Sequence, residues 1–366
     1  MCMADERDVY WDIVKGIGIS VIVLAHSGWT NNVVMQAVSY FDLALFFFVS
    51  GYLFKEKYSS DPYTYIGRKI RNLWWPYMQY VVVFILLHNV FLKLNIYSSL
   101  VGIPGIITTL PYTFLGTVAS LSTALLQTAQ SELMAGAMWF IMPLFVIMSI
   151  FSVIKNISYR LPLPSILKEL LVLFLVVFVS GLGVLHLKRS ITLPWRTDVA
   201  FYAAPIVYLG YLARKYWNKA IFHISFVVLA VLLFIFCFKQ NAYIAYFPGG
   251  IGKWPLTYLA SISGIYIVLY MAKQISKISF LAKGISYLGK SSFHIMALHF
   301  LSFKIVNLID VLVHHKPMYN IAQFAISNTS WWPIYLVAGL CVPAFCVYLY
   351  RQIHTSLINK TKNNAS

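Results

Sequence analysis

Long apolar stretches without a charged residue recur along the whole chain. They cover residues 16–41, 73–92, 133–154, 170–187, 220–238, 254–272 and 317–350. Each stretch supplies about 20 apolar residues, the length of helix that crosses a hydrocarbon core of about 30 Å. The stretches are continuous rather than alternating, which favours membrane-spanning helices over a β-barrel. Only 11% of the residues are charged, against roughly 25% in a soluble domain, so an ordinary soluble fold is excluded.

We predict an all-α fold, a polytopic bundle of about ten transmembrane helices. The predicted spans are residues 11–28, 39–54, 73–92, 136–154, 167–187, 198–212, 220–238, 254–271, 291–313 and 332–349. No linker, low-complexity tract or soluble segment interrupts this pattern, so residues 1–366 are expected to form a single membrane domain. The long outside connection at residues 95–135 is expected to contain short re-entrant or interfacial helices, which either cap the bundle or form one wall of an outward-facing substrate site.

The 28 lysines and arginines give the chain a net charge of +17, and their distribution follows a membrane topology. With a cytoplasmic N-terminus, six of them lie in outside loops, two lie near span ends, and the other 20 lie inside. The six are Lys188, Arg189, Arg196, Lys239, Lys253 and Lys316, and the two are Lys93 and Lys304. This asymmetry follows the positive-inside rule and predicts that both termini are cytoplasmic. The basic balance therefore indicates membrane lipids, and no nucleic acid, as partners.

The first predicted span carries three residues with possible chemistry, Asp12, Lys15 and His26. Lys15 and His26 are eleven residues apart, which is about 20° past three full helical turns, so both lie on one face. The rise between them is roughly 16 Å, which places a cation at the cytoplasmic mouth and an imidazole deep in the bundle. Histidine suits proton transfer near neutral pH. The alternative is a histidine that only hydrogen-bonds a neighbouring helix, but the charged pair on the same helix favours a functional site.

Two arginines mark the cytoplasmic end of the third predicted span. Arg68 and Arg71 are three residues apart and share a face if the segment is helical. Two adjacent guanidinium groups suit bidentate recognition of phosphate. Ordinary positive-inside anchoring explains many such clusters and stays open as the alternative.

Three further residues are candidates for substrate binding: Asp42, Trp139 and Asp198. Asp42 opens an apolar run rich in phenylalanine. Trp139 is equally expected to pack in the bundle at the outer interface. Asp198 is either an N-terminal helix cap or a site carboxylate. No metal-ligand spacing, Ser–His–Asp spacing, P-loop or GxGxxG pattern is present in the sequence, so no metal is expected.

Taken together, these segments resemble the acyltransferase-3 family of bacterial membrane O-acyltransferases, and within it the fucose-4-O-acetylase-like members. Asp12-x-x-Lys15-Gly-Ile with His26 looks like the family's Arg/Lys-x10-His motif, and Arg68-x-x-Arg71 looks like its Arg-x-x-Arg motif. Further similar segments are residues 45–52, 76–77, 139–141, 193–198, 208–212 and 288–299. The chain departs from the family pattern in having a lysine at position 15, where arginine is frequent, and Asp42-Leu-Ala ahead of the phenylalanine run.

The resemblance implies a multi-pass protein of the bacterial cytoplasmic (inner) membrane that uses acetyl-CoA, or a related acyl-CoA, as donor. It implies a carbohydrate hydroxyl as acceptor, on a surface polysaccharide such as O-antigen or exopolysaccharide, or on its lipid-linked precursor. Lys15, Arg68 and Arg71 would then hold the CoA phosphates, and Asp12 would orient or neutralise Lys15. His26 would act either as a general base for the hydroxyl or as a covalent acyl carrier.

The main alternative is a transporter or flippase of lipid-linked sugars or small molecules without acyl-transfer chemistry. Charged residues within the membrane fit such a protein too. Transporters frequently contain inverted repeats, and no such symmetry is visible in this sequence. A regulatory membrane module is disfavoured because no soluble effector segment is present.

Overall fold

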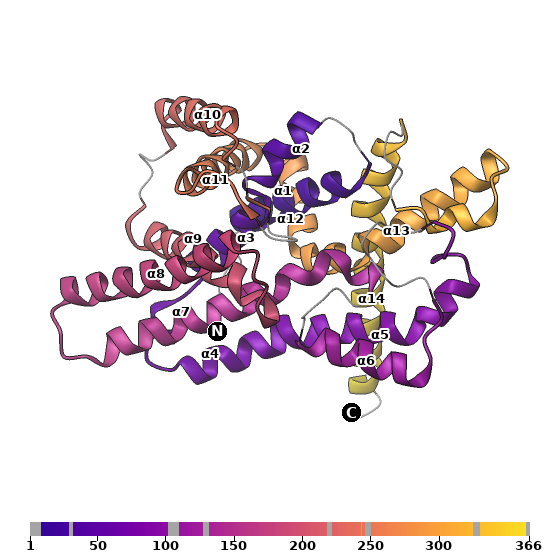
Figure 1. Cartoon of the computed structure of the whole chain (residues 1–366), viewed down its shortest axis with the longest axis horizontal. Helices are drawn as coiled ribbons and strands as arrows, with labels where there is room; N and C mark the ends of the chain where they lie inside the picture. Colours follow the sequence, from indigo (N-terminus) through magenta and orange to yellow (C-terminus); the bar gives the residue numbers. More distant parts are fainter. Residues whose placement is uncertain are drawn as a thin grey trace. The chain divides into compact units, whose positions relative to one another are not determined.

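The computed structural model describes residues 9–28, 32–101, 110–126, 132–217, 222–242, 244–245, 250–324 and 330–363. Almost all of these residues are helical (Figure 1), which confirms the predicted all-α class. One pair of two-residue antiparallel strands, β1 (Ile244–Ala245) and β2 (Gly250–Ile251), is the exception within the described residues. The chain forms two compact units, each assembled from separate parts of the sequence.

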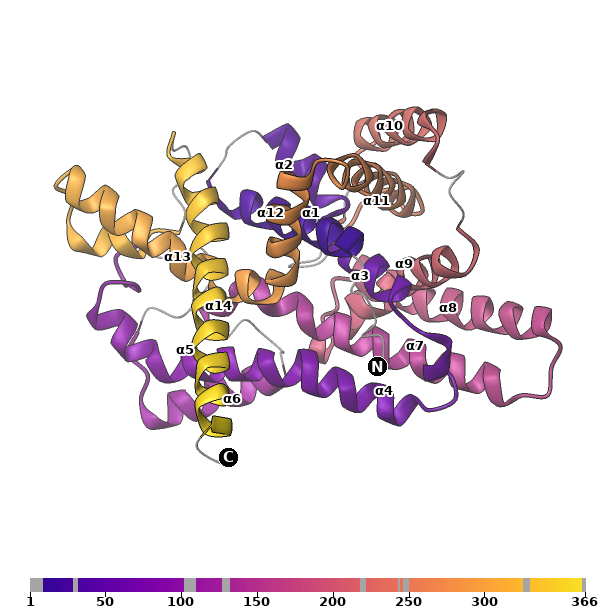
Figure 2. The ribbon, with the colours of Figure 1, turned by 180° about the vertical axis from the view of Figure 1, so that it is seen from behind.

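The first unit contains the N-terminal helix and the C-terminal part of the chain. Its helices are α1 (Val9–His26), α12 (Ser279–Lys290), α13 (Ser292–Val313), the 3-10 helix η6 (Met318–Ala322) and α14 (Trp332–Asn363). Figure 2 shows α14 crossing α13 steeply, and the two helices pack against each other.

The second unit contains most of the middle of the chain. Its helices are α2 (Asn32–Ser39), α3 (Asp42–Tyr52), η1 (Glu56–Tyr58), α4 (Pro62–Lys69), the π-turn η2 (Ile70–Trp74), most of α5 (Trp75–Lys93), α6 (Phe114–Leu126), η3 (Leu133–Phe140), α7 (Ile141–Arg160), α8 (Ser165–Lys188), η4 (Pro194–Arg196), α9 (Thr197–Tyr216), α10 (Ile224–Lys239) and most of α11 (Leu256–Ile275). Helices α7, α8 and α9 lie side by side in Figure 1, and each packs on the other two.

Eight helical segments of the described chain are long and apolar enough to cross a membrane. They are Val9–His26, Val33–Tyr52, Pro62–Lys93, Leu133–Arg160, Ser165–Lys188, Leu256–Ile275, Ser292–Val313 and Trp332–Ser356. These segments match eight of the ten predicted spans. The other two predicted spans are helices as well, but α10 has only 16 residues, and α9 carries Asp198, Arg214 and Lys215 together with four tyrosines. The protein is therefore a multi-pass helical membrane protein.

Close approach of α1 and α12 depends on two glycines. A methyl group added at Gly16 would overlap the backbone carbonyl of Ile285, and one added at Gly289 would overlap the carbonyl of Asp12. Small residues let helices pack backbone to backbone in a membrane. The N-terminal half of α1, which carries Asp12 and Lys15, is consequently held directly against α12.

In the second unit, α3 and α9 approach each other in the same way. A side chain at Gly51 would overlap the carbonyl of Val207, and one at Gly210 would overlap the carbonyl of Phe48. The phenylalanine run of α3 is buried, and Phe46 and Phe47 both contact the ring of Phe140. Residues 45–52 and 208–212, two of the segments on which the family resemblance rests, therefore pack on each other.

Helix α4 begins at an N-cap residue, Asp61. The Asp61 carboxylate accepts a hydrogen bond from the backbone N–H of Thr64, 3.0 Å away, and Pro62 occupies the first position of α4. Hydrogen bonds from Thr64 hold the pKa of Asp61 below its usual value. The helix then continues through the π-turn into α5 without a break. A helix is also present in the long connection at residues 95–135, where α6 exposes an apolar surface that includes Phe114 and Leu115.

Candidate functional site

Asp12 and Lys15 form an ion pair on the first helix. The Lys15 Nζ lies 2.7 Å from Asp12 Oδ1, across one helical turn. The Asp12 side chain is buried, whereas that of Lys15 is 21% exposed. Burial of a carboxylate is costly unless it is paired, so Asp12 fixes the lysine ammonium at this end of α1. The remaining exposure of Lys15 leaves its ammonium group accessible to a ligand.

His26 is the last residue of α1, and its ring has a defined tautomer. The Nδ1 atom lies 2.9 Å from the backbone carbonyl oxygen of Ile22. A carbonyl oxygen can only accept, so Nδ1 carries the hydrogen and Nε2 carries the lone pair. The side chain is half-buried, and its Nε2 has no hydrogen-bond partner within the described part of the chain. The geometry therefore presents Nε2 as a base or a nucleophile.

A second imidazole, that of His299 on α13, lies next to His26. The two ring centroids are 5.3 Å apart, with an angle of 42° between the ring planes. The ring of Phe300 meets His26 edge-on at 5.0 Å. His299 is fully buried, and sequence reasoning did not make it a candidate site residue. Its signals in the sequence are that it is a polar residue within the predicted span 291–313 and that it ends segment 288–299. His294 is half-buried, and its ring lies edge-on to that of Phe293.

Arg68 and Arg71 lie in the second unit, on the helix that runs from α4 through η2. The segment is helical, which was the condition for the two arginines to share a face. Both side chains are exposed. Arg68 donates to the hydroxyl of Tyr58 at 2.9 Å and lies over its ring. Arg71 is the second residue of the π-turn, and such turns often mark functional sites in helices.

Trp139 and Asp198 are brought together by a residue that the sequence did not single out, Arg196. The guanidinium of Arg196 lies 5.3 Å from the ring centroid of Trp139, and its Nη2 donates to Asp198 Oδ2 at 3.0 Å. Arg196 and Asp198 are buried, and Trp139 is half-buried. Asp198 Oδ1 also accepts from the backbone N–H of Leu193 at 3.2 Å. Arg196 and the preceding Trp195 both have positive φ, and this tight turn directs the guanidinium back toward Asp198.

Asp42 is not part of that cluster in the described structure. It lies in the first turn of α3, half-buried, and its Oδ1 accepts from the backbone N–H of Leu43 at 2.6 Å. A carboxylate in this position complements the helix dipole.

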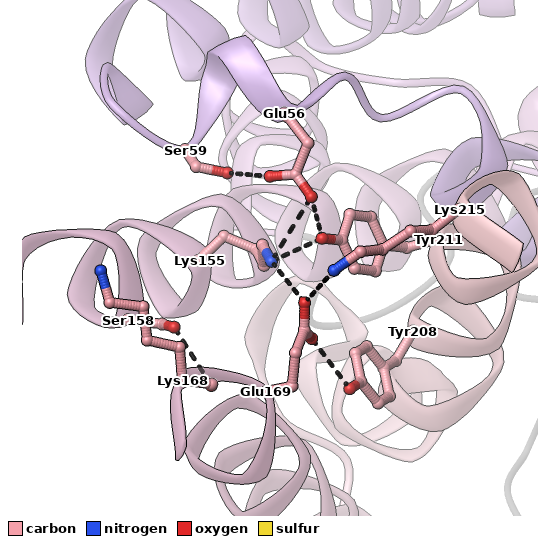
Figure 3. Close-up of polar contacts among 9 residues, drawn as sticks. All are labelled: Glu56, Ser59, Lys155, Ser158, Lys168, Glu169, Tyr208, Tyr211 and Lys215. Carbon is pink, nitrogen blue, oxygen red and sulfur yellow. Dashed lines mark hydrogen bonds and ion pairs between the residues drawn. The ribbon is translucent and has the colours of Figure 1, made fainter. Parts of the chain in front are cut away.

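A polar pocket of about 190 Å³ opens between α7, α8 and the η1 segment, and the sequence did not predict it. Figure 3 shows Lys155 of α7 pointing between Glu56 and Glu169, and its Nζ lies 3.9 Å from a carboxylate oxygen of each. The same Nζ donates to the hydroxyl of Tyr211 at 2.7 Å. That hydroxyl in turn donates to Glu56.

The far side of this pocket is closed by α9. Lys215 donates to Glu169 Oε1 at 2.7 Å, and Tyr208 donates to the other carboxylate oxygen at 3.3 Å. The buried ammonium of Lys155 is thereby matched by carboxylates on two sides. The network ties α7, α8, α9 and η1 together and leaves no lone buried charge among its members.

A buried imidazole–carboxylate pair lies elsewhere in the second unit. His88 Nδ1 is 3.2 Å from Glu132 Oε2, and the His88 ring stacks on Tyr112 at 3.6 Å. Both side chains are almost fully buried. In the sequence, His88 is a polar residue within the predicted span 73–92. It is 44 residues from Glu132, so no helical or strand periodicity could indicate their contact.

Comparison with known proteins gives one family. The chain matches the model of the acyltransferase-3 family, an acyltransferase domain, over residues 8–351. No curated protein and no solved structure matches the chain.

Proposed function

The chain belongs to the acyltransferase-3 family and is a membrane acyltransferase, and on that premise we propose that it transfers an acetyl group from cytoplasmic acetyl-CoA to a sugar hydroxyl. The acceptor in this proposal is a surface polysaccharide, such as an O-antigen or exopolysaccharide, or its lipid-linked precursor. The membrane is the bacterial inner membrane, where the donor is available on the cytoplasmic side.

The observation that carries the proposal is the free Nε2 of His26. Its lone pair is fixed by the hydrogen bond from Nδ1 to Ile22, and it lies at the end of a helix whose other end carries Lys15. As general base, Nε2 takes the proton of the sugar hydroxyl while the hydroxyl oxygen attacks the thioester carbon. The carbon–sulfur bond then breaks, and the proton passes from His26 to the departing CoA thiolate. The products are the sugar ester and free CoA.

The covalent alternative uses the same atom. Nε2 attacks the thioester carbon, CoA leaves as the thiolate, and the sugar hydroxyl takes the acetyl group from the imidazole in a second step. Its hydroxyl proton ends on the thiolate, so both routes give the same products.

Three cationic side chains would bind the donor. Arg68 and Arg71 are exposed guanidinium groups, which suit the diphosphate and 3′-phosphate of CoA. Lys15 adds an ammonium group held in place by Asp12. The proposed acyl transfer uses no metal ion, and we propose none.

Trp139 is the strongest candidate for contact with the acceptor. A half-buried aromatic face held by a cation suits the apolar face of a sugar ring. In this proposal Asp198 acts on the acceptor through Arg196, which it fixes against Trp139. Asp42 stays a candidate for acceptor binding from the half-buried start of α3.

The proposal is tested with radiolabelled acetyl-CoA and membrane vesicles that contain the native acceptor. Vesicles with wild-type protein are expected to move label into the lipid-linked sugar or polysaccharide fraction, and vesicles with His26→Ala are not. The matched control is His186→Ala, because His186 is also a half-buried helical histidine whose Nδ1 bonds the carbonyl four residues earlier. Equal labelling by the wild type and His26→Ala would contradict the role of His26. Transport of unlabelled sugar in the absence of acyl transfer would favour the flippase alternative.

A further inference from the structure

The pair of imidazoles on α1 and α13 has a consequence for the reaction. We propose that His299 is a positioning residue for His26, which stabilises the positive charge that His26 acquires when it removes the acceptor proton. The inference rests on the proposed function, in which His26 is the general base.

The tautomer of His299 follows from its own helix. Its Nδ1 lies 3.0 Å from the carbonyl oxygens of both Ile295 and Met296. Carbonyl oxygens only accept, so Nδ1 carries the hydrogen and Nε2 carries the lone pair. Because Nδ1 is held against the backbone of α13, the Nε2 edge of the ring projects away from that helix.

The Nε2 atom of His299 is buried and has no hydrogen-bond partner within the described residues. Buried acceptors are normally satisfied, and an unsatisfied one costs free energy. The rings of Phe300 and Phe303 lie 4.3 and 5.6 Å from the His299 ring, so aromatic walls surround it. We therefore expect the unpaired Nε2 of His299 to gain an interaction in another protonation state of the site.

The neighbouring ring supplies that state. In the resting protein, His26 and His299 both present lone pairs, and neither offers the other a donor. Once His26 takes a proton on Nε2, its ring is a cation whose centroid lies 5.3 Å from that of a neutral imidazole with an unshared lone pair. A favourable interaction that arises only after proton transfer stabilises the transition state and leaves substrate binding unchanged. In a low-polarity site such a charge–dipole interaction is screened little.

The inference covers both routes of the proposed reaction. As a general base, His26 becomes an imidazolium when it takes the hydroxyl proton. In the covalent route Nε2 carries the acetyl group while Nδ1 keeps its hydrogen, so the ring is an acylimidazolium and is cationic as well. A large effect of His299 on turnover therefore supports a cationic His26 in the reaction, whichever route it follows.

The test measures the apparent kcat and KM for acetyl-CoA by release of the CoA thiol in vesicles that contain the native acceptor. We expect His299→Phe, which keeps a ring of similar size but removes the lone pair, to lower kcat on the order of 10–100-fold with KM unchanged. The control His186→Phe is expected to leave both constants unchanged. A normal kcat in folded His299→Phe, or a raised KM at normal kcat, would overturn the inference.

A second pair of variants decides the question if His299→Phe does not fold. His299→Gln places an acceptor oxygen near the former Nε2 position, whereas His299→Asn places its polar atoms near the former Nδ1. We expect kcat to be about tenfold higher for His299→Gln than for His299→Asn, and equal values would overturn the inference. Failure of the proposed function is recognised separately, because there His26→Ala would itself remain active.

Discussion

Lys155 donates a 2.7 Å hydrogen bond to the hydroxyl of Tyr211 and stands between the carboxylates of Glu56 and Glu169. The lysine comes from α7 and the tyrosine from α9, so the pair joins two helices that are distant in sequence. Because Lys155 is buried, its loss would leave Glu169 without one of its two cationic partners.

We therefore expect Lys155→Met to lower the free energy of unfolding by roughly 1–3 kcal/mol. Thermal unfolding in detergent measures this, and Lys168→Met is the matched control. Lys168 lines the same pocket, but its ammonium contacts the backbone carbonyl and the ring of Tyr159 and no carboxylate of the described residues, so its loss should change the free energy by less than about 0.5 kcal/mol. Equal effects of the two substitutions would show that the Lys155 network does not stabilise the unit.

Substitution of the two arginines on the α4–η2 segment tests donor binding. We expect Arg68→Gln and Arg71→Gln each to raise the KM for acetyl-CoA roughly tenfold, because each removes a charge-assisted contact with phosphate. Raising the acetyl-CoA concentration should restore the rate. Arg160→Gln, which removes an exposed arginine at the end of α7, serves as control. A lowered kcat at saturating donor would assign these arginines to a step after binding.

The contact between α1 and α12 predicts that replacing a glycine of α12 by alanine has opposite effects on stability at positions 289 and 284. Gly289→Ala places a methyl group against the carbonyl of Asp12 and is expected to cost about 1–3 kcal/mol of stability through overpacking. Gly284→Ala meets no atom within 4 Å and is expected to stabilise by about 0.5–1 kcal/mol, because alanine is the better helix former. If both changes stabilise, the close approach of the two helices is wrong.

Because Arg196 and Asp198 form a buried ion pair, substitution of Asp198 is expected to lower the stability of the protein. Asp198→Asn leaves a guanidinium that is 3% exposed without its carboxylate, and we expect a loss of about 3–5 kcal/mol of unfolding free energy. Trp139→Phe keeps the apolar packing and should leave stability nearly unchanged while it weakens acceptor use. Unfolding curves and transfer rates of both variants check this. Unchanged stability of Asp198→Asn would indicate that the carboxylate is free to bind substrate directly.

Local patterns in the sequence predicted the helices. The uncharged runs predicted the spans, and the family resemblance implied that Asp12 orients or neutralises Lys15, with which it forms an ion pair across one turn. The pair Asp61-Pro62, a cap residue followed by proline, marks the start of α4 in the same local way. In each case the physical cause acts over a few residues, so it is visible in the sequence.

Contacts between distant helices were not predictable in this way. His299 reaches His26 because α1 packs against α13, and Arg196 reaches Trp139 because η3 and η4 both meet α7. The periodicity of apolar residues indicates which face of a helix is buried, but in a membrane helix nearly every face is apolar. Periodicity also does not indicate which other helix packs on a given face. The predicted span 220–238 begins before Ile224, the first residue of α10, because apolar residues precede it, and residues 220–221 lie outside the described part of the chain.

The most direct test of acyl transfer by His26 is mass spectrometry of surface glycans from cells that lack the gene. The cells are complemented with the wild type, with His26→Ala or with the control His186→Ala. We predict that the wild type and His186→Ala restore a single added acetyl mass and that His26→Ala, present in the membrane at the same level, does not. Glycans that are chemically identical in all strains but less abundant outside the deletion cells would contradict acyl transfer and assign the protein to sugar transport.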